Sequence, residues 1–183
     1  FSPEAIFKQN TTLFNSIKNS FVYRPYLDFN IIESLRELSK KIKEHHHKKT
    51  VKNKISNKYE FNLKLSPGGI RDIELISQLQ QLIRGGNYKA LRTHSTQSAI
   101  KAIHSLGFFN NDEFSKLIEA YVFFRRIEHQ IQYFENQQVH LYKEEMPFKI
   151  TPLNYIKSDI ELTKKIEIHK NNVMEIFNRS FNQ

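Results

Sequence analysis

Two glycine pairs bracket a stretch whose apolar residues recur at helical spacing, and this arrangement most constrains the fold. Between Gly68–Gly69 and Gly85–Gly86 the apolar residues step by three or four positions, at Ile70, Ile73, Ile76, Leu79 and Ile83. That spacing places them on one face of an α-helix, and glycine permits the sharp turns that begin and end such a helix. We therefore predict an amphipathic helix over residues 69–84, which must bury its apolar face against other helices.

The same periodicity recurs along most of the chain. It predicts further helices after an Asp28 cap, near residues 95–106, from an Asp112 cap to about Asn136, and from Ser158 onwards. No internal repeat and no second composition regime interrupts them. The expected fold class is therefore all-α, a bundle of five to six helices forming one helical domain over residues 1–183.

One short segment departs from helical spacing. Phe61, Leu63 and Leu65 alternate with polar residues, which predicts at most one short strand at about residues 59–65. A single strand is not stable by itself, and no partner is visible elsewhere in the sequence. We therefore expect a strand that lacks its natural partners. Residues 45–60 before it are polar and aperiodic, which predicts an exposed linker, and a proline-containing stretch at 146–152 breaks the chain again.

Composition narrows the classes of function. The chain has no cysteine, which excludes disulfides and thiolate metal sites and favours an intracellular setting. No apolar run approaches the roughly 20 residues needed to span a membrane. The net charge of +9 is diffuse, and its densest stretch, HHHKKTVKNK at residues 45–54, has the composition of a solvated linker. We do not expect nucleic-acid binding, although a basic helical adaptor or nucleic-acid-binding bundle is the alternative from another class.

The sharpest local motif is SPGGIRDIE at residues 66–74. A helix that starts directly after a glycine turn offers free N–H groups to an anion, and Arg71 adds a positive group suited to phosphate. The candidate cleft-lining or nucleotide-binding residues are Gly68, Gly69, Arg71 and Glu74, with Gln78 and Gln81 continuing their polar row. The alternative is a glycine turn with a surface pair between Arg71 and Glu74.

A second motif is AYVFFRRIEHQIQ at residues 120–132. Its polar residues share one helix face, and the second-row candidates are Arg125 and Glu128, accompanied by His129 and Gln132. Such a row either contacts a catalytic domain or target protein, or it ties neighbouring helices together by ion pairs.

Catalytic motifs are absent from the sequence. It contains no GxxxxGK[ST] loop, no HExxH and no GxSxG, and its four aspartates lie far apart at Asp28, Asp72, Asp112 and Asp159. Asp72 and Glu74 diverge on a helix, which makes a poor joint metal site. We therefore assign no catalytic residue and no metal ligand to this chain.

Three ordered stretches carry a resemblance to a known family. FVYRPYLDFNIIESLRELSKKIKEH (21–45), FNLKLSPGGIRDIELISQLQQLIRGG (61–86) and AYVFFRRIEHQIQYFENQQVH (120–140) resemble the helical region that follows the catalytic head of bacterial glutamine synthetase adenylyltransferases. The resemblance covers about residues 5–145. It implies a helical fragment of a larger protein whose head supplies the Gly-Ser and Asp-x-Asp residues that hold magnesium, and a start at Phe1 rather than Met fits a fragment.

For the larger protein the resemblance implies transfer of AMP from ATP to glutamine synthetase and its removal, with magnesium, in the cytoplasm. The implied partners are glutamine synthetase, a PII signalling protein and the protein's own catalytic head, and the chain's role would be structural and regulatory. The GGIRDIE and LIRGG stretches are more similar to the deadenylylating half of the family. The alternative within the superfamily is a PII uridylyltransferase, which carries a similar segment after its head.

Overall fold

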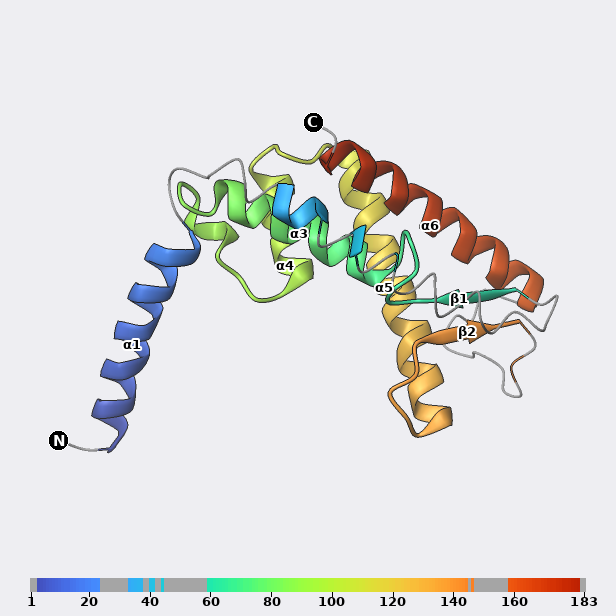
Figure 1. The fold of residues 1–183 in the computed structure, drawn as a ribbon, viewed down its shortest axis with the longest axis horizontal. Coiled ribbons are helices and arrows are strands. Elements are labelled where there is room, and N and C mark those ends of the chain that lie inside the picture. The colour runs from blue at the N-terminus through green and yellow to red at the C-terminus, as the bar shows by residue number, and fades with distance from the viewer. Residues whose placement is uncertain are drawn as a thin grey trace.

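The structure, a computed structural model, describes residues 3–23, 33–37, 40–41, 44, 59–144, 146 and 158–181. Four helices form its body: α3 (Ile70–Arg84), α4 (Thr96–Ser105), α5 (Asn111–Glu135) and α6 (Asp159–Phe181). The long helices α5 and α6 pack against each other, α3 packs on both, and α4 packs on α3 and α5 (Figure 1). A short 3-10 helix, η1 (Lys89–Leu91), connects α3 to α4. The predicted all-α bundle is confirmed.

The remaining described helix, α1 (Pro3–Val22), stands apart from this body (Figure 1). Of the described elements, the closely packed pairs join the other helices and strands, and none of these pairs includes α1. Its described contact with the body lies at its end, where the Tyr23 ring lies against Gly85 and the Arg92 guanidinium sits 5.4 Å from the ring centroid. Among the described elements, α1 therefore lacks extensive packing against the body.

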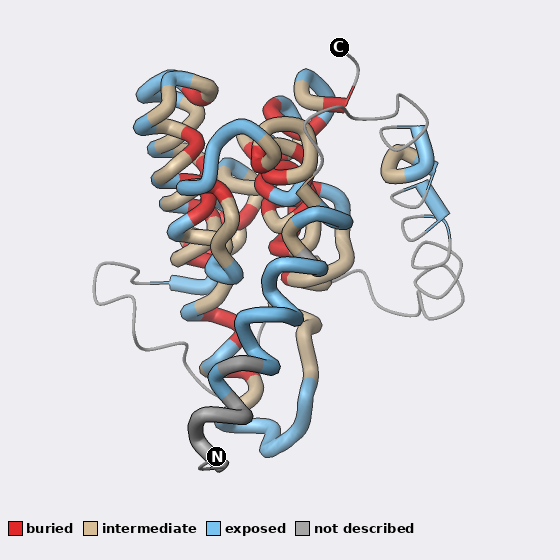
Figure 2. The backbone as a smooth tube through the Cα atoms, turned by 90° about the vertical axis from the view of Figure 1, so that its left-hand side faces the viewer, coloured by how far each residue is buried: buried red, intermediate tan, exposed pale blue. Residues whose placement is uncertain are grey.

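The core lies where α3, α4, α5 and α6 meet, and Figure 2 shows the buried residues gathered there. The sequence periodicity identified most of it, because the stripes on the predicted helices are the residues that the bundle buries. The fully buried side chains come from every element of the body and include Leu63, Ile70, Ile73, Ile76, Leu79, Leu91, Ile100, Ile103, Leu117, Phe124, Ile127, Ile131, Ile166 and Val173.

Local chemistry explains where the helices begin and end. Ser95 caps α4 through its side chain, as a helix near 95–106 requires, and α5 ends at Asn136 in the left-handed conformation. The expected Asp112 cap of α5 is wrong. The cap is Asn110, whose side chain accepts the Glu113 N–H at 2.9 Å while Glu113 accepts the Asn110 N–H at 2.8 Å. This reciprocal capping box satisfies two backbone donors and outcompetes a start two residues later.

The expectation of an unpartnered strand is also wrong. β1 (Glu60–Asn62) pairs antiparallel with β2 (Leu141–Lys143), in a register that sets Phe61 opposite Tyr142. Three residues are too few to show an alternating pattern, so β2 left no signal in the sequence. The strand also ends earlier than predicted. The Asn62 side chain accepts the N–H groups of Lys64 and Leu65, which folds the chain into a turn.

Several predictions fall on residues outside the described ranges. They include the Asp28 cap, most of the linker at 45–60 and the break at 146–152. Of the helix expected after Asp28, residues 33–37 are described and are helical, with Leu35 packed against the core. Across the described ranges, no helix combines the length and apolar character needed to cross a membrane.

Candidate functional site

The SPGG turn joins β1 to α3 and is buried at both glycines. Gly68 has φ +77°, a left-handed conformation that side chains rarely adopt. A Cβ on Gly68 would lie 2.4 Å from the Lys170 carbonyl oxygen of α6, and one on Gly69 would lie 2.7 Å from the Leu63 carbonyl oxygen. Glycine is therefore required at both positions by close approach of backbone, and at Gly68 also by φ. Their placement makes this turn the contact between the start of α3 and the middle of α6.

The free N–H groups expected at the start of α3 are not free. Gly69 N–H donates to the Ser66 carbonyl at 2.9 Å, Ile70 N–H to the Leu63 carbonyl at 2.8 Å, and Arg71 N–H to the Lys64 carbonyl at 3.1 Å. Gly68 N–H donates to the Asp72 carboxylate at 2.8 Å. Backbone carbonyl oxygens and the Asp72 carboxylate accept the hydrogen bonds that these N–H groups would otherwise donate to an anion. Asp72 also places a negative charge at the helix start, where it would repel an anion. The helix start is thus built as a closed turn, and an anion contact there depends on the Arg71 side chain.

The two sequence motifs meet in one ion-pair network. Arg125 of α5 reaches across to α3, where its guanidinium donates to Glu74 at 2.9 Å, and it also donates to Glu128 on its own helix at 2.7 Å. Glu128 is 1% exposed, and its second oxygen lies 2.6 Å from His140 Nδ1 without the alignment of a hydrogen bond. Burial alone lowers the pKa of Arg125, yet its bonds to Tyr121 and Glu128 raise it overall, so the guanidinium stays charged.

Arg71 extends this network to the surface. Its guanidinium lies 3.8 Å from Glu74, and its side chain is 38% exposed. Glu74 therefore stands between a partly buried arginine and a partly exposed one. The arrangement presents one accessible guanidinium, positioned by a buried network, beside a rigid glycine turn. Chemically it suits contact with a phosphate or carboxylate at the surface.

The network does not fit a magnesium site. Glu74 and Glu128 both accept hydrogen bonds from Arg125, and a cation would have to displace that positive charge from its carboxylates. In the ranges that the structure describes, no group of three or more His, Asp or Glu side chains is arranged to hold a metal ion.

Other members of the predicted polar rows have different roles. Gln81 is buried, and its amide donates to the Leu91 carbonyl at 2.6 Å and to the Thr93 carbonyl at 2.8 Å. It therefore fixes η1 against α3 instead of facing a cleft. Gln78 and His129 are exposed, while Gln132 lies 3.3 Å from His140. His140 joins the site from outside both polar rows, and nothing in the sequence had indicated a role for it.

A second polar cluster lies beside the glycine turn and had no signal in the sequence. Tyr59 donates to Glu167 at 2.5 Å, and Glu167 accepts Lys170 at 2.9 Å. Burial and this bond raise the pKa of Tyr59 well above its usual value. Lys170 is also the residue whose backbone touches Gly68. The cluster thus anchors the segment before β1 on α6.

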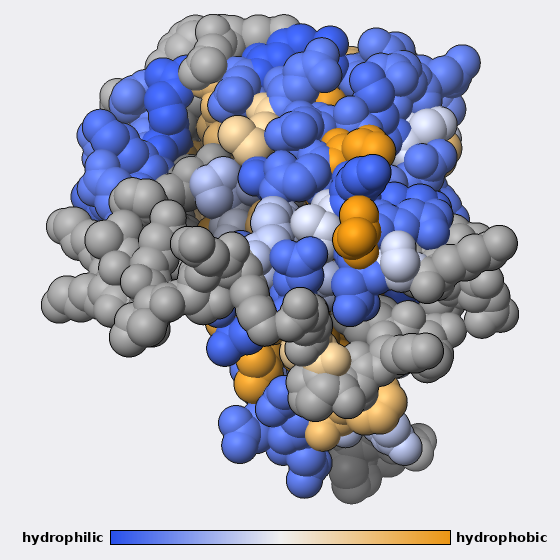
Figure 3. All heavy atoms as spheres, turned by 90° about the vertical axis from the view of Figure 1, so that its right-hand side faces the viewer, coloured by the Kyte–Doolittle hydropathy of each residue, from blue (hydrophilic) through white to orange (hydrophobic). Residues whose placement is uncertain are grey.

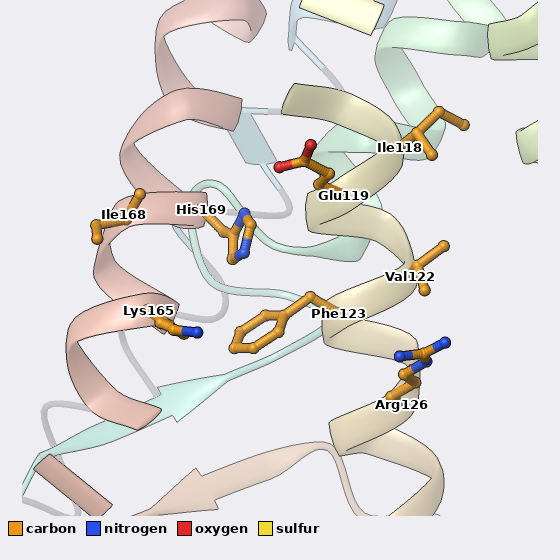
Figure 4. A pocket seen from close by; sticks show the side chains of 8 residues that line it. All are labelled: Ile118, Glu119, Val122, Phe123, Arg126, Lys165, Ile168 and His169. Atoms are coloured by element: carbon orange, nitrogen blue, oxygen red, sulfur yellow. The ribbon is translucent and has the colours of Figure 1, made fainter. Parts of the chain in front are cut away.

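A hollow of about 520 Å³ opens between α5 and α6 (Figure 4). Phe123 of α5 and His169 of α6 both line it and lie in contact, with ring centroids 4.6 Å apart. Burial lowers the pKa of His169, and no hydrogen-bond partner for its Nδ1 lies in the described residues. Figure 3, viewed from the right-hand side of Figure 1, shows apolar side chains in small separate patches on a mostly hydrophilic face. The rest of the lining comprises Ile118, Glu119, Val122, Arg126, Lys165 and Ile168.

Comparison with known proteins shows the family to which the chain belongs. A family model described as GlnD PII-uridylyltransferase matches residues 36–180, and the chain belongs to this family. That match spans the glycine turn, the ion-pair network and the hollow.

Its curated relatives carry a more particular name. A protein of Neisseria meningitidis serogroup A is 32% identical over 89% of this chain and 18% of its own length. One of Bordetella pertussis is 40% identical over 69% of this chain and 13% of its own, and one of Idiomarina loihiensis is 37% identical over 72% and 13%. All three are named bifunctional glutamine synthetase adenylyltransferase/adenylyl-removing enzyme, which confirms the resemblance indicated by the motifs. The chain spans less than a fifth of the length of these relatives.

Proposed function

We propose that this chain is a helical, structural and regulatory domain of a bifunctional glutamine synthetase adenylyltransferase, which transfers AMP to and from glutamine synthetase. The observation that carries the proposal is the match to relatives of that name over 69–89% of the chain. The likeness includes the region of both polar motifs, so the network is available for a role in that longer protein.

The geometry supports a role as one wall of a catalytic cleft. Arg125 and Glu128 tie α5 to α3 through Glu74, and this holds Arg71 at the surface beside the glycine turn. A guanidinium held in this way can contact a phosphate or AMP group without first being ordered, which lowers the entropic cost of the contact. Gly68 and Gly69 act in this proposal by shaping the turn.

The chemistry itself belongs to other parts of the longer protein in this proposal. Its catalytic head would bind ATP and magnesium, and this chain alone would be inactive, because Glu74 and Glu128 are already bound to Arg125. A PII signalling protein would convey the nitrogen signal, and the protein would act in the cytoplasm. Incubating this chain alone with glutamine synthetase, ATP and magnesium tests the first point, and AMP incorporation traceable to the chain would contradict it.

The decisive experiment replaces Arg71 in the longer protein. Arg71→Ala removes a charge-assisted contact and should lower the rate of AMP transfer or removal by about ten- to a hundredfold if the contact forms in the transition state. Lys→Ala at residue 52 or 54, in the predicted linker, is the control for loss of one positive charge. Equal activity of the two folded variants would indicate that the GGIRDIE segment has a structural role alone.

The second candidate is a helical domain of a PII uridylyltransferase, which the description of the matching family model favours. The two candidates differ in acceptor and nucleotide. The longer protein should label glutamine synthetase with AMP from ATP, whereas PII labelled with UMP from UTP would support the alternative. A basic adaptor that binds nucleic acid rests on charge alone, and it predicts binding that weakens steeply with salt.

A further inference from the structure

The apolar face of α1, made of Leu13, Phe14, Ile17 and Phe21, is the largest exposed apolar feature on a single helix of the described chain. These side chains are 60%, 64%, 62% and 70% exposed. Positions 13, 17 and 21 repeat every fourth residue and Phe14 flanks them, so the four side chains form one continuous face. A face of this kind on a helix normally lies against another part of a protein.

The composition of α1 strengthens this argument. Its 20 residues, PEAIFKQNTTLFNSIKNSFV, include three Asn, two Thr, two Ser and three Phe, which are weak helix formers. Isolated helices shorter than about 12–15 residues are marginal in water even when rich in alanine, and weak helix formers increase the length that is needed. The anchoring contact described for α1 is that of Tyr23 with Gly85 and Arg92, beyond its last turn. A stable α1 therefore requires a cover along its apolar face.

We propose that the apolar face of α1 is an intramolecular docking surface for a domain of the longer polypeptide that lies outside residues 1–183. This inference rests on the proposed function because it requires that longer polypeptide. The relatives are long enough to contain such a domain, since the chain matches only 18% of the length of the Neisseria protein and 13% of that of the Bordetella protein.

The size and charge of the apolar face favour a linked domain over a separate protein as the partner that covers it. Stable interfaces between separate chains bury about 800 Å² per partner and use about 20–30 residues on each side, more than one helix face offers. A covalently linked domain is present at an effective concentration of about millimolar, so a smaller interface suffices. The four side chains of the apolar face carry no charge. The surface of the domain that covers them is therefore expected to be apolar and uncharged.

Amide hydrogen exchange on this chain and on the longer polypeptide tests the proposal. The amides of residues 8–21 should exchange at least about tenfold more slowly in the longer polypeptide, because docking suppresses local unfolding of α1. Equal exchange in the two proteins would overturn the inference. Protection of α1 that rises with the concentration of the 183-residue chain would also overturn it, because a second copy would then cover the face. Protection that requires anionic lipid vesicles would overturn it as well.

Two variants of the longer polypeptide sharpen the test. Ile17→Glu places a charge on the apolar face and should return α1 to fast exchange, whereas Asn15→Glu, on the opposite side of the helix, should not. Exchange of residues 70–84 reports whether the body remains folded. If Ile17→Glu also accelerates exchange in α3, the milder Ile17→Ala decides by the same criterion. Unchanged α1 protection in the deciding Ile17 variant would overturn the inference.

The outcome is separable from the proposed function. AMP transfer to glutamine synthetase is measured on the same preparation. Activity without α1 protection contradicts the docking surface alone, and α1 protection without activity contradicts the proposed function alone.

Discussion

Arg125 and Arg126 are neighbours in the sequence but belong to two different faces of α5. Arg125 is on the bonded face, where it donates to Glu74 and Glu128. Arg126 is on the open face, which lines the hollow beside α6, and it makes no ion pair within the described part of the chain. The difference shows that charge alone does not reveal a role. A step of one residue turns a helix by about 100°, which is enough to separate a buried network from solvent.

The comparison also separates two kinds of constraint. On the bonded face every charge has a partner on another residue, so a substitution leaves a buried group unpaired. On the open face Arg126 is exposed and has no such partner among the described residues, so its replacement should cost the fold little, and any constraint on it would have to come from binding. The following predictions test that distinction, starting with the largest expected effect.

The largest effect is expected for Arg125→Ala. Removing this guanidinium leaves Glu74 and the buried Glu128 without their donor, so the free energy of unfolding should fall by about 3–5 kcal/mol. Arg126→Ala, the matched loss of one positive charge, should change it by less than about 0.5 kcal/mol. Urea unfolding followed by circular dichroism measures both. Similar midpoints for the two variants would remove the distinction between the faces.

The next effect concerns two glycines with the same backbone conformation in different surroundings. Gly68 and Gly107 have φ values of +77° and +78°, but only Gly68 has backbone within reach of a Cβ. Gly68→Ala should cost about 3 kcal/mol, from both φ and overpacking against α6. Gly107→Ala should cost about 1 kcal/mol, from φ alone.

Thermal melting of these two variants isolates the contact between the glycine turn and α6. If both glycine variants melt at the same temperature, the close approach to Lys170 is relieved by a small shift and does not constrain the turn.

The sequence predicted the parts of this fold that depend on local chemistry. The stripe of Ile70, Ile73 and Ile76 and the apolar face of α6 each follow from spacing within one element. It also grouped Arg71 with Glu74 and Arg125 with Glu128, and the structure brings the members of each pair within ion-pair distance. The sequence could not join the two pairs, because the contact between α3 and α5 depends on how two helices pack. The role of Gln81 was missed for the same reason, since its partners are carbonyl groups of a later segment.

The smallest effect is expected on the open face and depends on pH. Burial lowers the pKa of His169 in the folded chain, with Lys165 acting in the same direction and Glu119 opposing it. Below a pH of about 6.5 the unfolded chain therefore binds a proton that the folded chain does not, and stability falls as the pH falls. His169→Asn removes this contribution.

Denaturation midpoints at about pH 7.5 and about pH 5.5 measure the effect. The native chain should lose more stability between the two than the His169→Asn variant does, and the difference cancels the contributions of other groups. An equal loss in both proteins would show that His169 is solvated like an exposed histidine.

The pairing of β1 with β2 has a consequence for the order in which this domain folds. The contact between Glu60 and Lys143 closes a loop that contains α3, α4 and α5. Helices form from neighbouring residues, whereas this sheet must bring together two short segments across the whole loop, at an entropic cost that grows with loop length. Packing of α3 on α5 shortens that search, so the sheet should form after these helices have packed. Its appearance would then mark the closure of this loop during synthesis, since neither strand finds its partner before the chain has been made as far as Lys143.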